Sequence, residues 1–171
     1  NKHQGEHPRM GATDVCPLIP IQNVTIKECI KYSKILASKV SKHLNIPVYL
    51  YEFSASNKNR VNLANIREGE FEKFSKKINS EEWKPDYGKT IIGSAGVTAI
   101  GARNFLIAYN VNLNTNNKKI ATDIALDIRE KGRFKRDKNN KIIRDENGKG
   151  LRKPGKFKFC KAVGWYIKEY N

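Results

Sequence analysis

The sequence lacks several features that would place the protein outside the ordinary globular class. No apolar run approaches the roughly 20 residues that a membrane-spanning helix needs. The first residues show no secretory signal pattern of a basic start, an apolar stretch and a cleavage site. The three cysteines form no C-x-x-C pair, and an odd, scattered set is typical of reduced thiols rather than of a disulfide framework. We therefore expect a cytoplasmic protein with no membrane partner.

Combinations of residues that bind metal ions are also missing. The three histidines lie on separate predicted elements without zinc-like spacing, and the cysteines do not complement them: His3, His7 and His43. We expect no metal cofactor. No internal repeat is visible either, and 171 residues suit one domain with a substantial core.

Acidic residues are few beside the basic ones, and the net charge is +16. Residues 129–158 contain thirteen Lys or Arg against four Asp or Glu. Such a block either binds nucleic acid or another anionic surface, or is a solvated loop. No helix-turn-helix, zinc-finger or aromatic RNA-binding signature accompanies it, so we expect no specific nucleic-acid partner. Turn residues within it predict a basic surface insertion at about 133–158.

Apolar patterning predicts a mixture of strands and helices. Thr25 and Glu28 form a capping box that begins a helix ending at Asn45. Shorter helices are predicted at 63–67, 70–78 and 120–128. Strands are predicted at 16–21, 48–53, 96–100, 104–113 and 160–168. The fold class we expect is α+β, a largely antiparallel sheet with helices packed on one face.

One loop near the start of the chain concentrates reactive side chains. In GEHPRMGATDVCP, residues 5–17, His7 is the side chain that titrates near neutral pH without help. Pro8 restricts His7 to extended backbone, and glycines on either side allow tight turns. The loop therefore presents one imidazole as a candidate proton carrier. A single His-Pro is, by itself, also compatible with an ordinary turn.

The charged neighbours of His7 each have two interpretations. Glu6 and Asp14 either orient the imidazole and raise its pKa, or cap a turn. Arg9 either binds a carboxylate, on a substrate or on Asp14, or forms a surface salt bridge. The sequence leaves both interpretations open.

The second candidate site is DYGKTIIGSAG at 86–96, which contains a glycine-rich connector at 88–96. Glycines at 88, 93 and 96 allow the backbone to approach a flat ligand, and Thr90 and Ser94 offer hydrogen bonds. The connector matches neither the dinucleotide nor the P-loop pattern. Asn110 and Asn112, on one face of the predicted strand 104–113, either face a ligand or bond at a sheet edge.

Six segments in order carry a family resemblance that covers essentially the whole chain: GEHPRMGATDVCPLIPI, VYLYE at 48–52, NLANIREGEFE at 62–72, W-x-PD-x-G at 83–88, GVTAIGARNFLIAYNVNL at 96–113 and KAVGWYIKEYN at 161–171. They resemble the glutamate formimidoyltransferases, folate enzymes of histidine breakdown. The resemblance implies that residues 1–171 are an incomplete amino-terminal subdomain with a ferredoxin-like sheet. We therefore expect the chain to be a piece of a longer protein, and the resemblance implies a homodimer.

The resemblance also implies a reaction and its site residues. A formimino group moves from N-formimino-L-glutamate to tetrahydrofolate, the co-substrate, giving 5-formiminotetrahydrofolate and glutamate. His7 is implied as the general acid/base. The implied folate contacts are Gly88, Lys89, Thr90, Ile91, Ile92, Gly93, Ser94, Ala95 and Gly96. Two alternatives stay open: formyl transfer from N-formylglutamate to the same acceptor, and a basic nucleic-acid-binding module.

Overall fold

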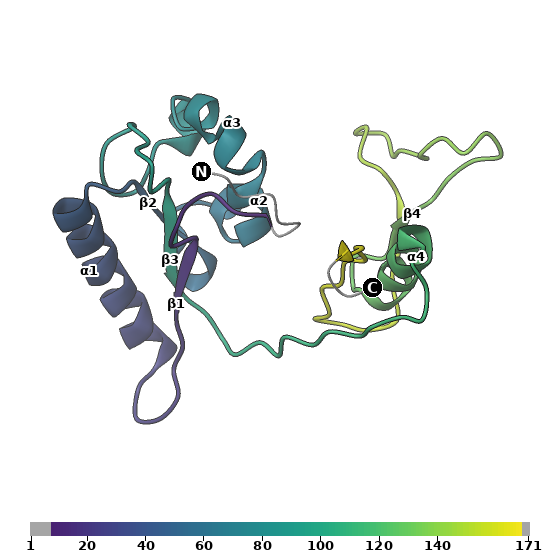
Figure 1. The fold of residues 1–171 in the computed structure, drawn as a ribbon, viewed down its shortest axis with the longest axis horizontal. Coiled ribbons are helices and arrows are strands. Elements are labelled where there is room, and N and C mark those ends of the chain that lie inside the picture. The colour runs from purple at the N-terminus through teal and green to yellow at the C-terminus, as the bar shows by residue number, and fades with distance from the viewer. Residues whose placement is uncertain (1–7, 169–171) are drawn as a thin grey trace. The chain divides into compact units, whose positions relative to one another are not determined.

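The computed structural model describes residues 8–168, and the chain forms two compact units, residues 1–108 and 109–171 (Figure 1). One subdomain over residues 1–171 was the expectation from the sequence. Neither unit, within the described residues, has a helix long and apolar enough to cross a membrane.

The first unit is built on a three-stranded sheet of β1 (Val15–Leu18), β2 (Val48–Leu50) and β3 (Thr98–Ala102) in the order β1-β3-β2 (Figure 1). Both pairings are parallel. The expectation of a largely antiparallel sheet is therefore wrong here. A helix follows β1, and further helices follow β2, so each connection returns the chain to the same end of the sheet. Pro17 of β1 lies in an edge strand, where a missing backbone N–H is tolerated.

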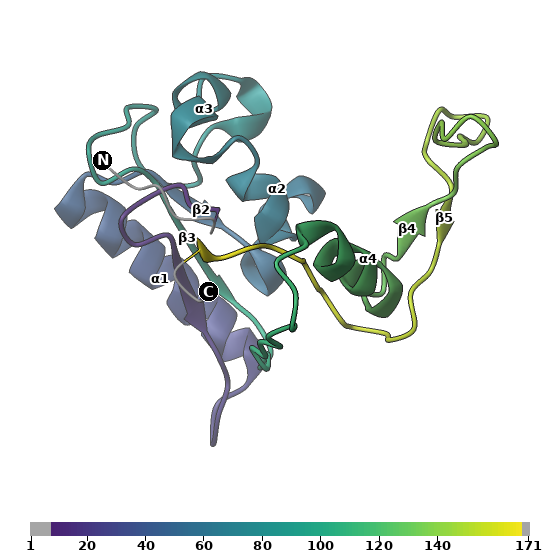
Figure 2. The same cartoon turned by 45° about the vertical axis from the view of Figure 1, so that its right-hand side comes forward.

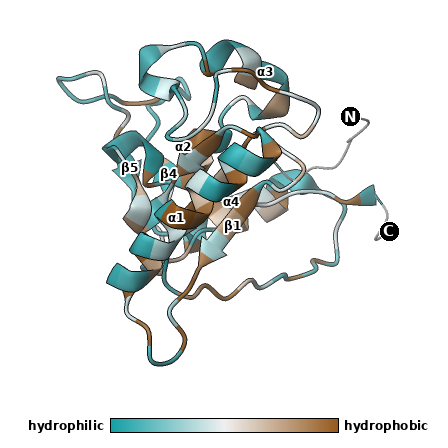
Figure 3. Ribbon diagram, turned by 90° about the vertical axis from the view of Figure 1, so that its left-hand side faces the viewer, coloured by the Kyte–Doolittle hydropathy of each residue, from teal (hydrophilic) through white to brown (hydrophobic). Residues whose placement is uncertain are grey.

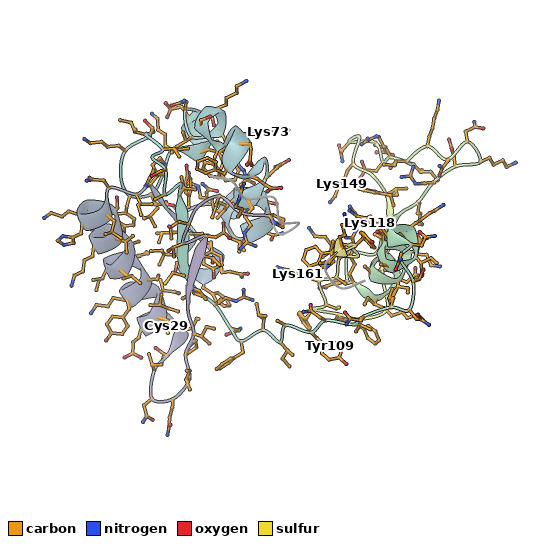
Figure 4. The ribbon with its side chains drawn as sticks, viewed as in Figure 1. Cys29, Lys73, Tyr109, Lys118, Lys149 and Lys161 are labelled. Atoms are coloured by element: carbon orange, nitrogen blue, oxygen red, sulfur yellow. The ribbon has the colours of Figure 1, made fainter. Side chains whose placement is uncertain are left out.

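Helix α1 (Ile26–Leu44) confirms its predicted ends. The Glu28 backbone N–H donates to the Thr25 hydroxyl at 3.2 Å, and the Thr25 N–H donates to the Glu28 carboxylate at 2.8 Å. Asn45 ends the helix in the left-handed conformation. Figure 3 shows hydrophilic and hydrophobic bands alternating along α1. The buried positions recur every fourth residue: Cys29 (labelled in Figure 4), Ser33, Ala37 and Ser41.

Helices cover both faces of the sheet, so the expectation that they pack on one face is wrong. Alternate residues of a strand point to opposite faces. Val48 and Leu50 pack with Ala37 of α1, whereas Tyr49 packs with Phe74 of α3. The second face is covered by α2 (Leu63–Arg67) and α3 (Glu70–Lys77), close to their predicted bounds. Three short 3₁₀ turns complete the unit: η1 (Glu52–Ser54), η2 (Lys58–Arg60) and η3 (Glu81–Trp83).

The second unit contains α4 (Lys118–Ile128) and an antiparallel pair of β4 (Arg133–Phe134) and β5 (Arg152–Lys153). Helix α4 confirms the helix predicted at 120–128. The strands predicted at 104–113 and 160–168 are wrong, since these residues form no strand where the structure describes them. A β-prone sequence becomes a strand only where a partner strand offers a hydrogen-bonding edge.

Residues 134–152 form a ribbon with two matching turns (Figure 2). In the first turn the Asp137 carboxylate accepts from the backbone N–H groups of Asn139 and Lys141, at 2.9 Å each, and Arg136 donates to a carbonyl across the turn. The second turn, eight residues later, has the same bonds. The Asp145 carboxylate accepts from the N–H groups of Asn147 and Lys149, and Arg144 donates to the Gly148 carbonyl. Figure 4 places Lys149 on this ribbon.

Candidate functional site

The structure brings the two candidate segments together at the amino-terminal ends of β1 and β3. Gly11 and Gly96 form an antiparallel bridge. The Ala12 N–H donates to the Ala95 carbonyl at 2.9 Å, and the Val97 N–H donates to the Met10 carbonyl at 3.0 Å. Two motifs that lie some 80 positions apart in sequence therefore share one surface. His7, which immediately precedes Pro8 in the sequence, lies outside the described residues. Glu6 lies outside them too.

Two glycines make this approach possible. A Cβ atom on Gly11 would lie 2.1 Å from the Val97 carbonyl oxygen, and one on Gly96 would lie 2.3 Å from the Met10 carbonyl oxygen. Gly96 also has a φ of +74°, which disfavours any side chain. From the sequence, Gly96 was expected to let the backbone approach a flat ligand. At Gly96 the group that comes close is instead the backbone of the loop that follows His7.

The connector 88–96 divides into an exposed part and an anchored part. Gly96 is buried, Ala95 is half-buried, and Ile92 packs against the core cluster that contains Met10. Gly93 has no atom within 4 Å of the position of a Cβ. The exposed members are Gly88, Lys89, Thr90, Ile91, Gly93 and Ser94. These six have surface to offer a ligand, and folate contact by the connector stays a prediction.

Asp14 holds the loop in shape. Its carboxylate accepts from the Met10 N–H at 2.7 Å and from the Arg67 Nε–H at 2.7 Å. Both side chains of the Asp14–Arg67 ion pair are 18% exposed. These contacts favour the turn-capping interpretation of Asp14. Sequence reasoning missed Arg67, because nothing local to α2 indicates a partner 53 residues away.

Arg9 pairs with α3 rather than with Asp14. Its guanidinium donates to the Glu72 carboxylate at 2.7 Å, lies 3.8 Å from the Glu70 carboxylate, and sits 5.9 Å from the centre of the Phe71 ring. The hydrogen bond to Glu72 is the main cause that raises the pKa of Arg9. The Phe71 N–H also donates to the Arg9 carbonyl at 3.0 Å. The salt-bridge interpretation of Arg9 is therefore the one the structure favours.

The start of α3 has an unusual backbone. Gly69 and Glu70 have φ values of +86° and +52°, and Glu70 is not a glycine. Residues in this region are strained unless their surroundings hold them. Here two interactions stabilise this backbone: the hydrogen bond from the Phe71 N–H to the Arg9 carbonyl, and the ion pairs of the Arg9 side chain with α3. Carboxylates in the first turn of a helix also suit its positive end.

The arrangement offers polar groups but, among the described residues, no imidazole at this edge. His43, on the last turn of α1, is exposed. Asn110 and Asn112 are exposed and belong to no strand, so the predicted polar stripe does not form. No cluster of three or more His, Cys, Asp or Glu side chains suited to a metal ion occurs between Pro8 and Lys168. The chemistry available here is hydrogen bonding to a bound molecule, beside a predicted proton carrier.

Two family models match the chain. The model described as the formiminotransferase domain, N-terminal subdomain, matches residues 1–103, and the model described as the formiminotransferase domain matches residues 108–171. The gap between the two matches falls next to the boundary at Ala108 that separates the two compact units.

The chain is similar to proteins from distant organisms. It is 47% identical over 169 residues to a glutamate formimidoyltransferase of Streptococcus pyogenes, covering 98% of this chain and 49% of that protein. It is 44% identical over 171 residues to a formimidoyltransferase-cyclodeaminase of Dictyostelium discoideum, covering 99% and 29%. It is 48% identical over 131 residues to a glutamate formimidoyltransferase of Thermoplasma acidophilum, covering 75% and 43%. The chain therefore spans half the length of these relatives or less.

Proposed function

The chain belongs to the formiminotransferase family, and from this we propose that the protein transfers the formimino group of N-formimino-L-glutamate to tetrahydrofolate. The products are 5-formiminotetrahydrofolate and glutamate, as in histidine degradation. The observation that carries the proposal is the bridge between Gly11 and Gly96, which joins the histidine loop to the glycine-rich connector. The names of the relatives agree with this activity.

The chemistry needs a group that both accepts and donates a proton. N5 of tetrahydrofolate attacks the amidine carbon and forms a tetrahedral intermediate, and the amine of glutamate then leaves. N5 loses its proton, and the leaving amine gains one. One C–N bond replaces another, so no oxidation state changes. An imidazole with a pKa near 7 performs both transfers efficiently. His7 is the residue we assign to this role.

The exposed part of the connector is the proposed folate site. Thr90 and Ser94 have hydroxyl groups and Lys89 carries a positive charge, which suits a ligand with a pterin ring and carboxylates. The open space above Gly93 allows a flat ring to approach the backbone. A homodimer and a cytoplasmic location, expected from the sequence, stay predictions.

The proposal is tested by assaying the purified protein, expressed together with any sequence that flanks residues 1–171, with tetrahydrofolate and either of two donors. Turnover of N-formimino-L-glutamate supports the proposal. Turnover of N-formyl-L-glutamate alone supports the alternative, in which oxygen replaces the donor NH. Absence of turnover with both donors, in a protein that is folded by circular dichroism, contradicts both.

The ribbon of residues 134–152 is the observation that favours a second candidate, a basic nucleic-acid-binding module. Its turn aspartates, Asp137 and Asp145, bond to backbone N–H groups, while most of its lysines and arginines are exposed. Binding that weakens steeply with salt, with no effect of tetrahydrofolate, would support this candidate. We prefer a surface insertion that takes no part in catalysis.

A further inference from the structure

The segment W-x-PD-x-G at 83–88 leads directly into the connector, and its Asp86 forms a buried ion pair with Arg60. The Arg60 guanidinium donates to the Asp86 carboxylate at 2.8 Å, and the two side chains are 6% and 10% exposed. We propose that the pair of Arg60 and Asp86 is a positioning device that fixes the start of the folate connector. This inference rests on the proposed function, since the connector is a folate site only if that function is correct.

Arg60 forms hydrogen bonds with three residues of the segment that precedes the connector. One nitrogen, Nη2, donates to the carbonyls of Glu82 and Lys84 at 2.8 and 2.6 Å, while Nη1 holds Asp86. The guanidinium lies 5.1 Å from the ring centre of Tyr49 and 6.0 Å from that of Trp83. A planar fork with several donors makes these contacts together, whereas the single ammonium of a lysine does not.

Asp86 also bonds to the sheet, and so connects Arg60 to β2. Its carboxylate accepts from the Leu50 N–H of β2 at 2.8 Å. The N–H groups of Asp86 and Tyr87 donate to the Val48 carbonyl, and the Val48 N–H donates to the Tyr87 carbonyl at 2.9 Å. Residues 86–87 are thus bonded along the outer edge of β2. Gly88 then turns the chain away with a φ of +94°.

The connector is therefore fixed at both ends and mostly exposed between them, apart from Ile92 and Ala95. Asp86 and Tyr87 bond to β2 at one end, and Gly96 packs against Met10 and Gly11 at the other. A loop held in this way keeps its exposed groups in place before a ligand arrives, which favours tight and specific binding.

Stability alone does not account for the pair. Apolar residues of similar volume replace buried ion pairs in many proteins without loss of stability. The Nε of Arg60 is buried and has no hydrogen-bond partner in the part of the chain that the structure describes, and such a donor lowers stability. The three contacts of Arg60 with residues 82, 84 and 86 explain its presence better.

The test compares Arg60→Lys and Asp86→Asn with a control, Lys31→Gly, which lowers stability at an exposed position of α1. Amide exchange of residues 86 and 87 should rise about tenfold or more in both test variants, while Val97, bonded to Met10 at the far end, keeps its rate. The Kd for tetrahydrofolate should rise about tenfold, with the KM for N-formimino-L-glutamate within about twofold of wild type. Lys31→Gly should show neither change.

Unchanged exchange at residues 86 and 87 in both variants overturns the positioning role. Equal changes in Lys31→Gly, at the same loss of Tm, also overturn it, because they would show a general effect of stability. If Arg60→Lys fails to fold, the milder Asp86→Asn decides. A wild-type protein that binds no tetrahydrofolate contradicts the proposed function, and the exchange comparison then decides the positioning role on its own.

Discussion

Substitution by alanine should lower stability at Gly96 of the connector but not at Gly93, three residues before it. At Gly96 the new Cβ would meet the Met10 carbonyl oxygen at 2.3 Å and the Gly11 Cα at 2.6 Å, with a φ of +74°. At Gly93 nothing lies within 4 Å. Gly96→Ala therefore forces the two loops apart, whereas Gly93→Ala fits without a clash.

The expected magnitudes follow from these contacts. A left-handed alanine costs about 1–2 kcal/mol. Separation of the loops breaks the bonds from Ala12 to Ala95 and from Val97 to Met10, each of which contributes about 0.5–1.5 kcal/mol net. Gly96→Ala should thus lose about 2–5 kcal/mol of unfolding free energy, and the Tm of the first unit should fall by roughly 10 °C or more. Gly93→Ala should stay within about 1 kcal/mol of wild type.

Thermal and chemical unfolding, followed by circular dichroism, measure both variants side by side. The tetrahydrofolate Kd of Gly93→Val adds a functional reading, since a larger side chain there blocks the open backbone without disturbing the core. Equal stability of Gly96→Ala and wild type would refute the packing argument. A loss at Gly93 as large as that at Gly96 would show that the connector is anchored along its whole length.

Three further predictions concern other parts of the chain. His7→Ala should lower turnover by about 10²–10⁴-fold with tetrahydrofolate affinity little changed; turnover near that of wild type would remove His7 from the mechanism. Replacement of residues 135–151 by a short Gly-Ser turn should preserve folding and most of kcat/KM, since long surface loops add little closure entropy; lost activity in a folded variant would assign the ribbon a functional role. Hydrogen bonds from the Thr25 backbone and side chain lower the pKa of Glu28 below its ordinary 4.5, so ionised Glu28 stabilises α1 above that value and the effect is lost as the pH falls through the lowered pKa. Glu28→Gln should therefore show a weaker dependence of unfolding free energy on pH below about pH 4.5, and an unchanged slope would contradict the cap assignment.

Local features of the sequence predicted the parts of the fold whose interactions are also local. The capping box of Thr25 and Glu28 and the stop at Asn45 fixed both ends of α1, since the bonds involved join residues within one helical turn. The predicted break between α2 and α3 falls at Gly69, whose backbone is left-handed. The glycine-rich connector and the histidine loop were identified as candidate sites from composition and resemblance, each from its own residues.

The parallel pairing of the strands and the long-range ion pairs of the site were decided only by the tertiary structure. Whether β1 pairs with β3 in a parallel sense depends on how the connection through α1 crosses it, and no short window contains that information. The strand predicted at 104–113 has the right residues but no partner edge. The pairs Asp14–Arg67 and Arg60–Asp86 join positions 53 and 26 residues apart, so each side chain looks like an ordinary charge until the fold brings its partner within hydrogen-bonding distance.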